Sequence, residues 1–141
     1  MSRESKLIFY GSAFFAKGVT IRINGGCVTI GNNFWANRKL LLSSHTSINI
    51  GDDFLAGWGC SIQDSSNHTM SCDGVIKKET AEIVIGSHVW FGSEVVCLKG
   101  VSVLSGSVVA MRAVLTKNYN ESNVLLGGGA SESYSAQNIV V

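Results

Sequence analysis

The sequence contains no proline, and it has no excess of charge of either sign. In 141 residues it carries 11 Lys+Arg and 10 Asp+Glu, a formal net charge of +1, which is too small for charge-driven binding to nucleic acid or anionic lipid. The absence of proline beside 16 glycines indicates tight turns that use positive φ angles in place of proline-fixed ones. Because the net charge is so small, we expect no nucleic-acid partner.

Long hydrophobic runs and paired cysteines are also missing. No segment approaches the roughly 20 apolar residues that a membrane span needs, and polar residues interrupt the start of the chain too often for a signal peptide. We expect no membrane span and a cytoplasmic location. No C-x-x-C spacing occurs among Cys27, Cys60, Cys72 and Cys97, which predicts reduced thiols without a zinc ribbon or a disulfide framework.

The remaining composition fits one well-buried core. Hydrophobic residues make up 45% of the chain and charged residues only 15%, and the length is too short for two ordinary domains. We therefore interpret residues 1–141 as a single domain.

A six-residue repeat is the strongest pattern in the chain. Apolar residues recur at every sixth position in the second half: Ile85, Phe91, Cys97, Val103, Val109 and Leu115. A second column of small or β-branched residues follows four places later: Val89, Val95, Val101, Ser107 and Ala113. The first half repeats in the same way, with a two-residue slip after Ile48: Ile30, Ala36, Leu42 and Ile48, then Ile50, Ala56 and Ile62. Three short strands and three turns make an 18-residue coil that stacks on its copies, so the period predicts an all-β parallel β-helix.

The repeat also sets the expected boundaries. Regular coils are predicted over about 30–117, interrupted by a polar loop at 69–82, with an irregular tail at 118–141. The strand-like stretches at 7–15 and 19–23 lack a clean phase, and we interpret them as a first, irregular coil that covers the end of the stack. Residues that tolerate strained turns mark the bends: Asn32-Asn33, Asp52-Asp53, Gly86-Ser87 and Gly106.

Two segments carry a family resemblance. IVIGSHVWFGSEVVCLKGVSV (83–103), followed by AVLTK (113–117), resembles the terminal coil of the hexapeptide-repeat acyltransferases. SIQDSSNHTM (61–70) is most similar to the sugar and polysaccharide O-acetyltransferases, in which a histidine stands just before an extended loop. The resemblance implies a left-handed parallel β-helix, a homotrimer, acetyl-CoA as co-substrate, no metal, and an O-acetyltransferase that acts on a sugar or polysaccharide precursor.

His68 is the predicted general base. Transfer of an acetyl group from a thioester to a hydroxyl needs a base that takes the hydroxyl proton, and donors that stabilise the oxyanion. His68 stands where the repeat ends and the polar loop begins, so its side chain is expected to project from the edge of the coils. The partner that would orient its imidazole is one of four alternatives: Asp64, Asp73, Glu94 or a backbone carbonyl.

The resemblance also suggests binding residues. Asn37 in FWANRKL corresponds to an asparagine that contacts acceptor hydroxyls, with a left-handed turn as its alternative role, and Trp58 is expected to face a sugar ring or a subunit interface. For CoA, the resemblance points to these residues: Trp90, Gly92, Ser93, Ala110, Met111, Arg112, Thr116 and Lys117. Main-chain groups there would pair with pantetheine amides, while Lys117 and Arg112 would meet phosphate.

The chain departs from the family at three places near the expected CoA site. Lys99 stands where proline is frequent, Ala110-Met111-Arg112 replaces a Gly-Ala-Gly run, and GGGASES replaces a Gly-Asn-Pro-Ala segment. Bulky Met111 would narrow the channel. These departures favour an alternative function as a non-catalytic β-helix scaffold or sugar-binding module.

The three histidines raise a further alternative, a zinc enzyme similar to the γ-class carbonic anhydrases. The ligands of that class include a close histidine pair, whereas His45, His68 and His88 are 23 and 20 residues apart. We interpret His45 and His88 as solvated or interface residues at turns. An acetyl-CoA-dependent O-acetyltransferase is therefore the main hypothesis.

Overall fold

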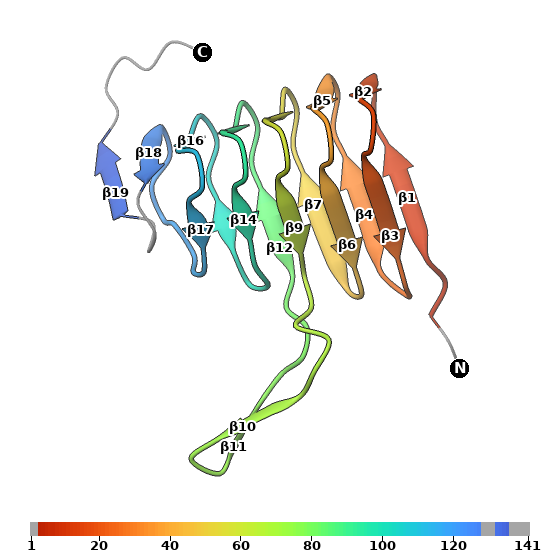
Figure 1. Ribbon diagram of the computed structural model, residues 1–141, viewed down its shortest axis with the longest axis vertical. Helices are drawn as coiled ribbons and strands as arrows, with labels where there is room; N and C mark the ends of the chain where they lie inside the picture. Colours follow the sequence, from red (N-terminus) through yellow and green to blue (C-terminus); the bar gives the residue numbers. More distant parts are fainter. Residues whose placement is uncertain (1–2, 128–131, 136–141) are drawn as a thin grey trace.

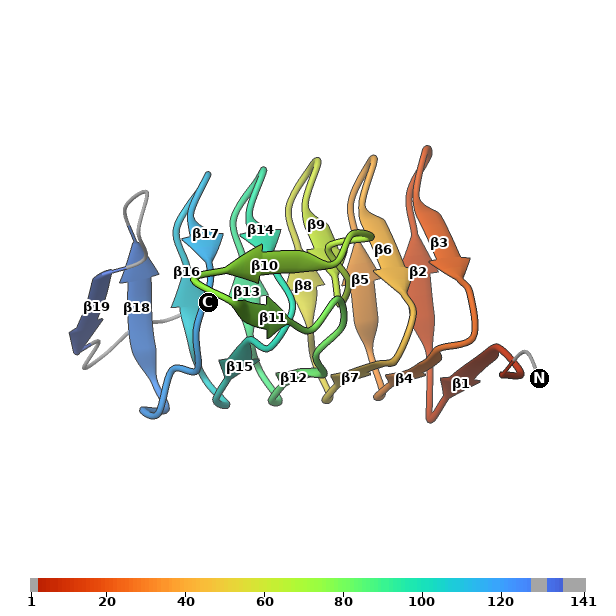
Figure 2. The same ribbon diagram turned by 90° about the horizontal axis from the view of Figure 1, so that it is seen from below.

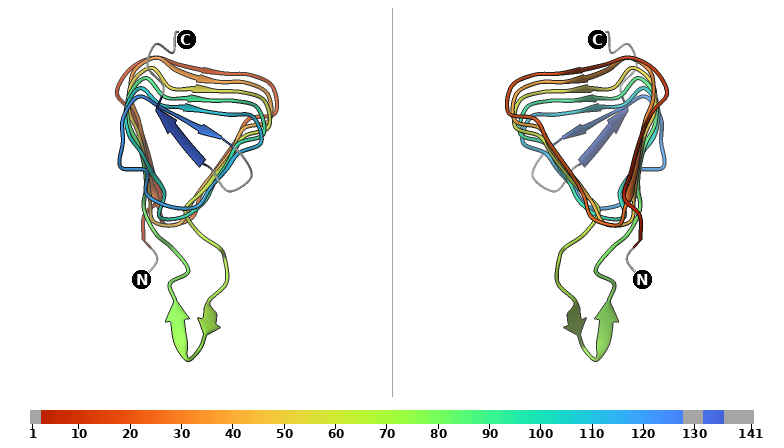
Figure 3. Two further views of the ribbon diagram at one scale, coloured as in Figure 1. Left: turned by 90° about the vertical axis from the view of Figure 1, so that its left-hand side faces the viewer. Right: turned by 90° about the vertical axis from the view of Figure 1, so that its right-hand side faces the viewer.

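The protein is a stack of triangular coils. The computed structural model describes residues 3–127 and 132–135, and that part of the chain contains strands and turns but no helix. Figure 1 shows the coils side by side, and Figure 3 shows the triangular cross-section end on. The described part of the chain therefore offers no helix with which to span a bilayer.

Three parallel sheets form the sides of the prism. Sheet A contains β1 (Lys6–Phe9), β4 (Cys27–Ile30), β7 (Ser47–Ile50), β12 (Ile83–Ile85) and β15 (Ser102–Val103). Sheet B contains β2 (Ala13–Phe15), β5 (Phe34–Ala36), β8 (Leu55–Ala56), β13 (Trp90–Phe91), β16 (Val108–Val109) and β18 (Val124–Gly127), and β19 (Glu132–Ser135) adds to it in antiparallel direction. Sheet C contains β3 (Thr20–Ile23), β6 (Leu41–Ser44), β9 (Ser61–Gln63), β14 (Val96–Cys97) and β17 (Val114–Leu115).

The residues of the six-residue repeat fill the interior. The following repeat residues are buried: Ile30, Ala36, Leu42, Ile48, Ile50, Ala56, Ile62, Ile85, Val89, Phe91, Val95, Cys97, Val101, Val103, Ser107, Val109, Ala113 and Leu115. Inside the prism the ring of Phe54 packs between those of Phe34 and Phe91, at centroid distances of 5.5 and 5.1 Å. Removal of this apolar surface from water is the main stabilising contribution to such a core.

Glycines precede the turns at the A–B corner because adjacent coils approach closely there. The N–H of Asp52 donates to Ser87 Oγ at 3.0 Å, and the N–H of Ser87 donates to Ser105 Oγ at 2.9 Å. A Cβ added at Gly86 would lie 2.6 Å from both the nitrogen and the Oγ of Ser105. The repeated Ile-Gly pairs of the sequence therefore mark the points where one coil bonds to the next.

The left-handed turns lie close to the predicted positions. At the A–B corner, positive φ angles occur at Asn33, Asp53, His88, Gly106 and Asn123. Three of these five residues belong to the predicted turns, whereas in the Gly86-Ser87 turn the left-handed residue is His88, one position later. Asparagine and aspartate adopt this conformation at low cost because their side chains form local hydrogen bonds.

Extra residues accumulate at the C–A corner. Leu41 pairs with Ser61, whereas Val96 pairs with Val114, so a coil before the loop holds 20 residues and a coil after it holds 18. The wider turn around His45 accounts for the two-residue slip in the repeat.

Asp64 closes this wider turn. Its buried carboxylate accepts hydrogen bonds from Ser44 Oγ at 2.7 Å and from the N–H groups of His45 and Thr46 at 2.7 and 3.0 Å. The carboxylate therefore substitutes for the acceptors that a regular turn would supply.

The regular stack extends beyond the expected range of 30–117 in both directions. Strands β1–β3 pair in register with β4–β6, so residues 6–23 form a complete coil. Leu7, Phe9 and Phe15 lie on this terminal coil and stay about two-fifths exposed (40%, 41% and 39%). At the other end Asn118 bridges to Ser102 and β18 joins sheet B. Within the predicted tail, residues 128–131 and 136–141 lie outside the described residues.

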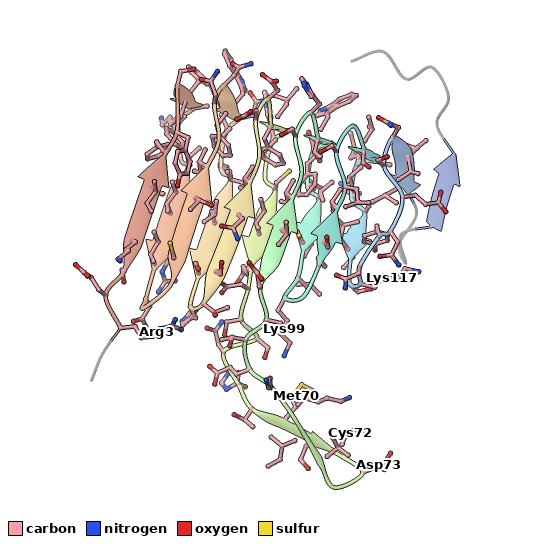
Figure 4. All side chains as sticks on the ribbon, turned by 180° about the vertical axis from the view of Figure 1, so that it is seen from behind. Arg3, Met70, Cys72, Asp73, Lys99 and Lys117 are labelled. Carbon is pink, nitrogen blue, oxygen red and sulfur yellow. The ribbon has the colours of Figure 1, made fainter. Side chains whose placement is uncertain are left out.

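A long loop leaves the stack at the C–A corner between β9 and β12. Its outer part is an antiparallel hairpin of β10 (Met70–Cys72) and β11 (Val75–Lys77) that projects away from the prism. The bridge between Ser65 and Thr80 joins the two arms near the base. Figure 2 shows the hairpin from the loop-bearing side, and Figure 4 marks Met70, Cys72 and Asp73 along it.

Candidate functional site

A groove crosses the outer face of sheet B and its B–C corner. Its volume is about 450 Å³, and it is lined by Asn37, Leu55, Gly57, Trp58, Trp90, Gly92, Ser93, Val108, Val109, Ala110 and Met111. Seven of these residues are predicted binding residues: Asn37, Trp58, Trp90, Gly92, Ser93, Ala110 and Met111. The fold therefore brings most of the predicted binding set into one concave surface.

Outward side chains of three adjacent strands form the floor of the groove. Trp90 of β13 stands in register between Leu55 of β8 and Val108 of β16. Trp58 is 60% exposed at the B–C corner, with the guanidinium carbon of Arg38 5.9 Å from its ring centroid. An apolar floor beside a corner of exposed backbone suits a long, thin ligand that carries amide groups.

Two backbone N–H groups in this groove have no acceptor. Within the described part of the chain, neither Ser93 N–H nor Met111 N–H donates a hydrogen bond. A Cβ at Gly57 would lie 2.6 Å from Ser93 N, and one at Gly92 would lie 2.8 Å from Met111 N, so glycine permits this close approach of the coils. The two donors come from successive coils, about 4.8 Å apart, and are available to a carbonyl or an oxyanion.

Asn37 lies at the edge of the groove in an ordinary backbone conformation. Its amide Nδ2 donates to the carbonyl of Ala56 at 3.1 Å. The residue with positive φ at this turn is Lys39, at 64°, so the alternative interpretation of Asn37 as a left-handed turn residue is wrong. The amide is held by the neighbouring coil, which leaves its carbonyl oxygen for a ligand.

Three residues of the predicted CoA set lie outside this groove: Arg112, Thr116 and Lys117. Nε of Arg112 is 2.6 Å from a carboxylate oxygen of Glu94. Thr116 and Lys117 follow β17 at the C–A corner, and Figure 4 places Lys117 on the loop-bearing edge of the stack. Lys117 Nζ is 5.8 Å from the ring centroid of Tyr119. Within one chain these residues are not brought together with the groove.

His68 stands at the base of the long loop. Its side chain is exposed, and its carbonyl oxygen accepts a hydrogen bond from Ser66 Oγ at 3.0 Å. The loop leaves from the corner opposite sheet B (Figure 3). One chain therefore places the predicted base and the groove on opposite sides of the prism.

None of the side chains predicted to orient the imidazole contacts His68. Asp64 is buried and bonded to the C–A turn, and Glu94 pairs with Arg112. Asp73 lies at the tip of the hairpin (Figure 4). Within the described residues His68 has no carboxylate partner.

The other two histidines are held by turns. His88 Nδ1 is 3.3 Å from Asp53 Oδ2 at the A–B corner, where the imidazole is exposed. His45 is half-buried, and its Nδ1 is buried without a hydrogen-bond partner. Within the described range, no cluster of three or more His, Cys, Asp or Glu residues could hold a metal ion.

Sequence reasoning missed the residues that brace the loop base. Lys99 Nζ donates to Lys78 O and to Ser66 Oγ, and so ties the coil after the loop to both loop arms. The only signal in the sequence was that lysine stands where the family resemblance implies a proline.

Known proteins are similar to this chain in sequence and in fold. Galactoside O-acetyltransferase of Escherichia coli is 29% identical over 106 residues, which cover 73% of this chain and 51% of that protein. A solved galactoside acetyltransferase in complex with coenzyme A superposes with a TM-score of 0.79 and 26% identity, over 93% of this chain and 65% of that one. No family profile matches the chain. The chain thus spans about half the length of its curated relative.

A second solved structure has a similar shape. A hexapeptide-repeat-containing acetyltransferase from Vibrio cholerae, complexed with acetyl-coenzyme A, gives a TM-score of 0.77 at 23% identity, over 92% of this chain and 72% of that one. The chain has the hexapeptide-repeat acetyltransferase fold. The predicted left-handed parallel β-helix and the resemblance to this group of acyltransferases are both confirmed. The hexapeptide repeat accounts for the buried columns, and the groove lies on one of its three faces.

Proposed function

We propose that the chain is an acetyl-CoA-dependent O-acetyltransferase that acts as a homotrimer on a hydroxyl of a sugar or polysaccharide precursor. The observation that carries the proposal is the sheet B groove, which gathers seven predicted binding residues beside two free N–H donors. The relative named for galactoside O-acetylation and the neighbour bound to coenzyme A support the same assignment. The four cysteines are free thiols, as suits the cytoplasm, where acetyl-CoA is available.

The groove fits the chemistry of an acyl-pantetheine chain. Trp90, Leu55 and Val108 provide an apolar floor, while Ser93 N–H and Met111 N–H provide donors for carbonyl oxygens. Acetyl-CoA would supply the thioester. The chain would hold it extended and would exclude water from one of its faces.

His68 serves as the general base in this proposal. Its imidazole removes the proton of the acceptor hydroxyl, and the hydroxyl oxygen forms a bond to the thioester carbonyl carbon. When the carbon–sulfur bond breaks, the imidazolium returns the proton to the departing thiolate. Backbone N–H groups stabilise the negative oxygen between the two steps.

A second copy of the chain is required because the base and the groove lie on opposite sides of the prism. His68 of one copy would face the sheet B groove of a neighbour, with the acceptor between them. A closed trimer contains three such sites, each built from two chains.

The proposal is tested by release of CoA thiol from acetyl-CoA in the presence of a panel of sugar acceptors. The wild-type protein should turn over with at least one acceptor, and His68→Ala should lose roughly 10²- to 10⁴-fold in kcat while its mass in solution stays unchanged. His88→Asn is the matched control, because it removes an exposed histidine elsewhere and asparagine tolerates the positive φ of 54°.

Two results would contradict the proposal. Undiminished turnover by His68→Ala would remove this residue from its role. Failure of the wild-type protein to bind acetyl-CoA by calorimetry would favour the non-catalytic scaffold.

A further inference from the structure

A second, polar cavity lies on the outer face of sheet C, at the edge next to the C–A corner. Its volume is about 220 Å³, and it is lined by Arg22, Asn24, Leu41, Ser43, His45, Gln63 and Asn67. It shares no lining residue with the sheet B groove. Asn67 directly precedes His68, so this cavity borders the loop base that carries the proposed general base.

The polar lining comes from three successive coils in register. Arg22 of β3 pairs with Ser43 of β6, and Ser43 pairs with Gln63 of β9. Side chains at paired positions of a parallel sheet point to the same face. The Gln63 amide is fixed in this row, because its Nε2 donates to Ser61 Oγ at 2.8 Å.

The lining has a positive charge and no negative one. Arg22 is its cationic residue, and no Asp or Glu belongs to it. In the described part of the chain Arg22 forms no ion pair, since the ion pairs there join Arg112 to Glu94 and His88 to Asp53. The nearby carboxylate of Asp64 is buried in the C–A turn and accepts three hydrogen bonds there. The charge of Arg22 is therefore left for a ligand.

His45 points to the same kind of ligand. Its Nδ1 is buried and has no hydrogen-bond partner, although it belongs to a residue that lines the cavity. A buried polar atom without a partner is costly, and rotation of the imidazole toward the cavity would let a ligand oxygen or hydroxyl satisfy it. Asn24 and Asn67, whose amides are further donors, belong to the same lining.

From these observations we infer that this cavity holds the carboxylate of an acidic sugar, and that Arg22 determines the specificity for it. The inference rests on the proposed function and specifies the acceptor class. The guanidinium offers a carboxylate two parallel N–H donors, and the neighbouring His68 is then placed to act on a hydroxyl of the same sugar. Arg22 acts in this scheme through binding and takes no part in proton transfer.

The test follows the imidazole proton resonances of His45 during titration with methyl glucuronide. Methyl glucoside is the neutral comparison, and glucose 6-phosphate distinguishes a phosphate ligand from a carboxylate ligand. The wild-type protein should show a saturable shift of the His45 resonance with the glucuronide, at least tenfold tighter than with the other two sugars. Arg22→Gln should abolish this preference, whereas Arg3→Gln removes a positive charge elsewhere and should preserve it.

Several outcomes would overturn the inference. These are equal affinity for the glucoside, tighter binding of the phosphate, and an unchanged preference in Arg22→Gln. Calorimetry with acetyl-CoA distinguishes failure of the acidic-acceptor inference from failure of the proposed function. A protein that binds acetyl-CoA but ignores the glucuronide keeps its proposed function and loses the acidic acceptor, whereas a protein that fails to bind acetyl-CoA loses the proposed function itself.

Discussion

The ammonium nitrogen of Lys99 lies 3.1 Å from the hydroxyl oxygen of Ser66 and 2.5 Å from the carbonyl oxygen of Lys78. Ser66 in turn donates to the carbonyl of His68 at 3.0 Å. A residue of the coil after the loop thus holds both arms of the loop at its base. Lys99 therefore braces the loop base that carries His68, the proposed general base.

Replacement of Lys99 should lower turnover without loss of acetyl-CoA binding. We expect Lys99→Met to reduce kcat by about tenfold, because a small displacement of a catalytic group is costly, while the calorimetric affinity for acetyl-CoA stays constant. Lys99→Arg, which keeps a charged donor, should recover part of the loss. An equal fall in both variants, or a weaker acetyl-CoA affinity, would indicate a general structural role instead.

Gly86→Ala should destabilise the protein strongly. The added methyl group would lie 2.6 Å from the Ser105 nitrogen, so two coils must separate, at a cost of about 2–4 kcal/mol. Gly74→Ala is the control, since Gly74 has a φ of +76° but no atom within 4 Å of an added Cβ; its cost should be about 1 kcal/mol. Thermal unfolding at one fixed protein concentration compares the two, and similar midpoints would contradict the close packing of the coils.

Stability should fall in alkaline solution because two thiols are buried. Burial raises the pKa of the Cys97 thiol far above its ordinary value, and burial also raises the pKa of Cys60. A raised pKa in the folded state means full stability below the unfolded pKa of about 8.5. Between the unfolded-state and folded-state pKa values each thiol then costs about 1.4 kcal/mol of stability per pH unit. Unfolding by urea at pH 8, 9 and 10 measures this slope.

The same measurement on Cys97→Ala should show a shallower slope at alkaline pH, whatever its stability at neutral pH. A slope identical to that of the wild type would contradict the assignment. Iodoacetamide should modify exposed Cys72 first, because Cys60 and Cys97 remain protonated and covered.

Met111→Ala should widen the sheet B groove at little cost in stability. Met111 is 65% exposed and lines the groove through a bulky side chain, where the family resemblance implies a small residue. We expect tighter binding of acetyl-CoA, by about threefold to tenfold, because a smaller side chain leaves the N–H donors of Ser93 and of residue 111 more accessible. Calorimetry with acetyl-CoA and free CoA measures the change, and weaker binding would show that Met111 contacts the ligand favourably.

The sequence predicted the core better than the site. Residues such as Ile85, Cys97 and Leu115 are buried because a six-residue period fixes their direction in every coil. The first coil was harder to predict, since its turn at Asn24 is longer and its apolar residues stay partly exposed at the open end of the stack.

The predicted site divided between two sides of the prism for a physical reason. A repeat predicts which face a residue occupies, and so it placed Trp90 and Ser93 in one groove. A repeat carries no information about contacts with another copy of the chain, on which the proposed role of His68 depends. Arg22 was not singled out, and Lys99 was noted only as a replacement for proline, because the contacts of both residues are with neighbours about 20 or more residues away.

Mixed oligomers show whether each site combines His68 of one copy with the groove of another. His68→Ala and Ala110→Trp, which fills the groove, should each be inactive alone. Their equal co-expression should restore about a quarter of the wild-type activity, the random frequency with which an intact His68 meets an intact groove in a closed ring. A mixture of His68→Ala with His68→Gln is the control and should stay inactive. Activity of the first mixture no higher than that of the separate variants would contradict a site shared between copies.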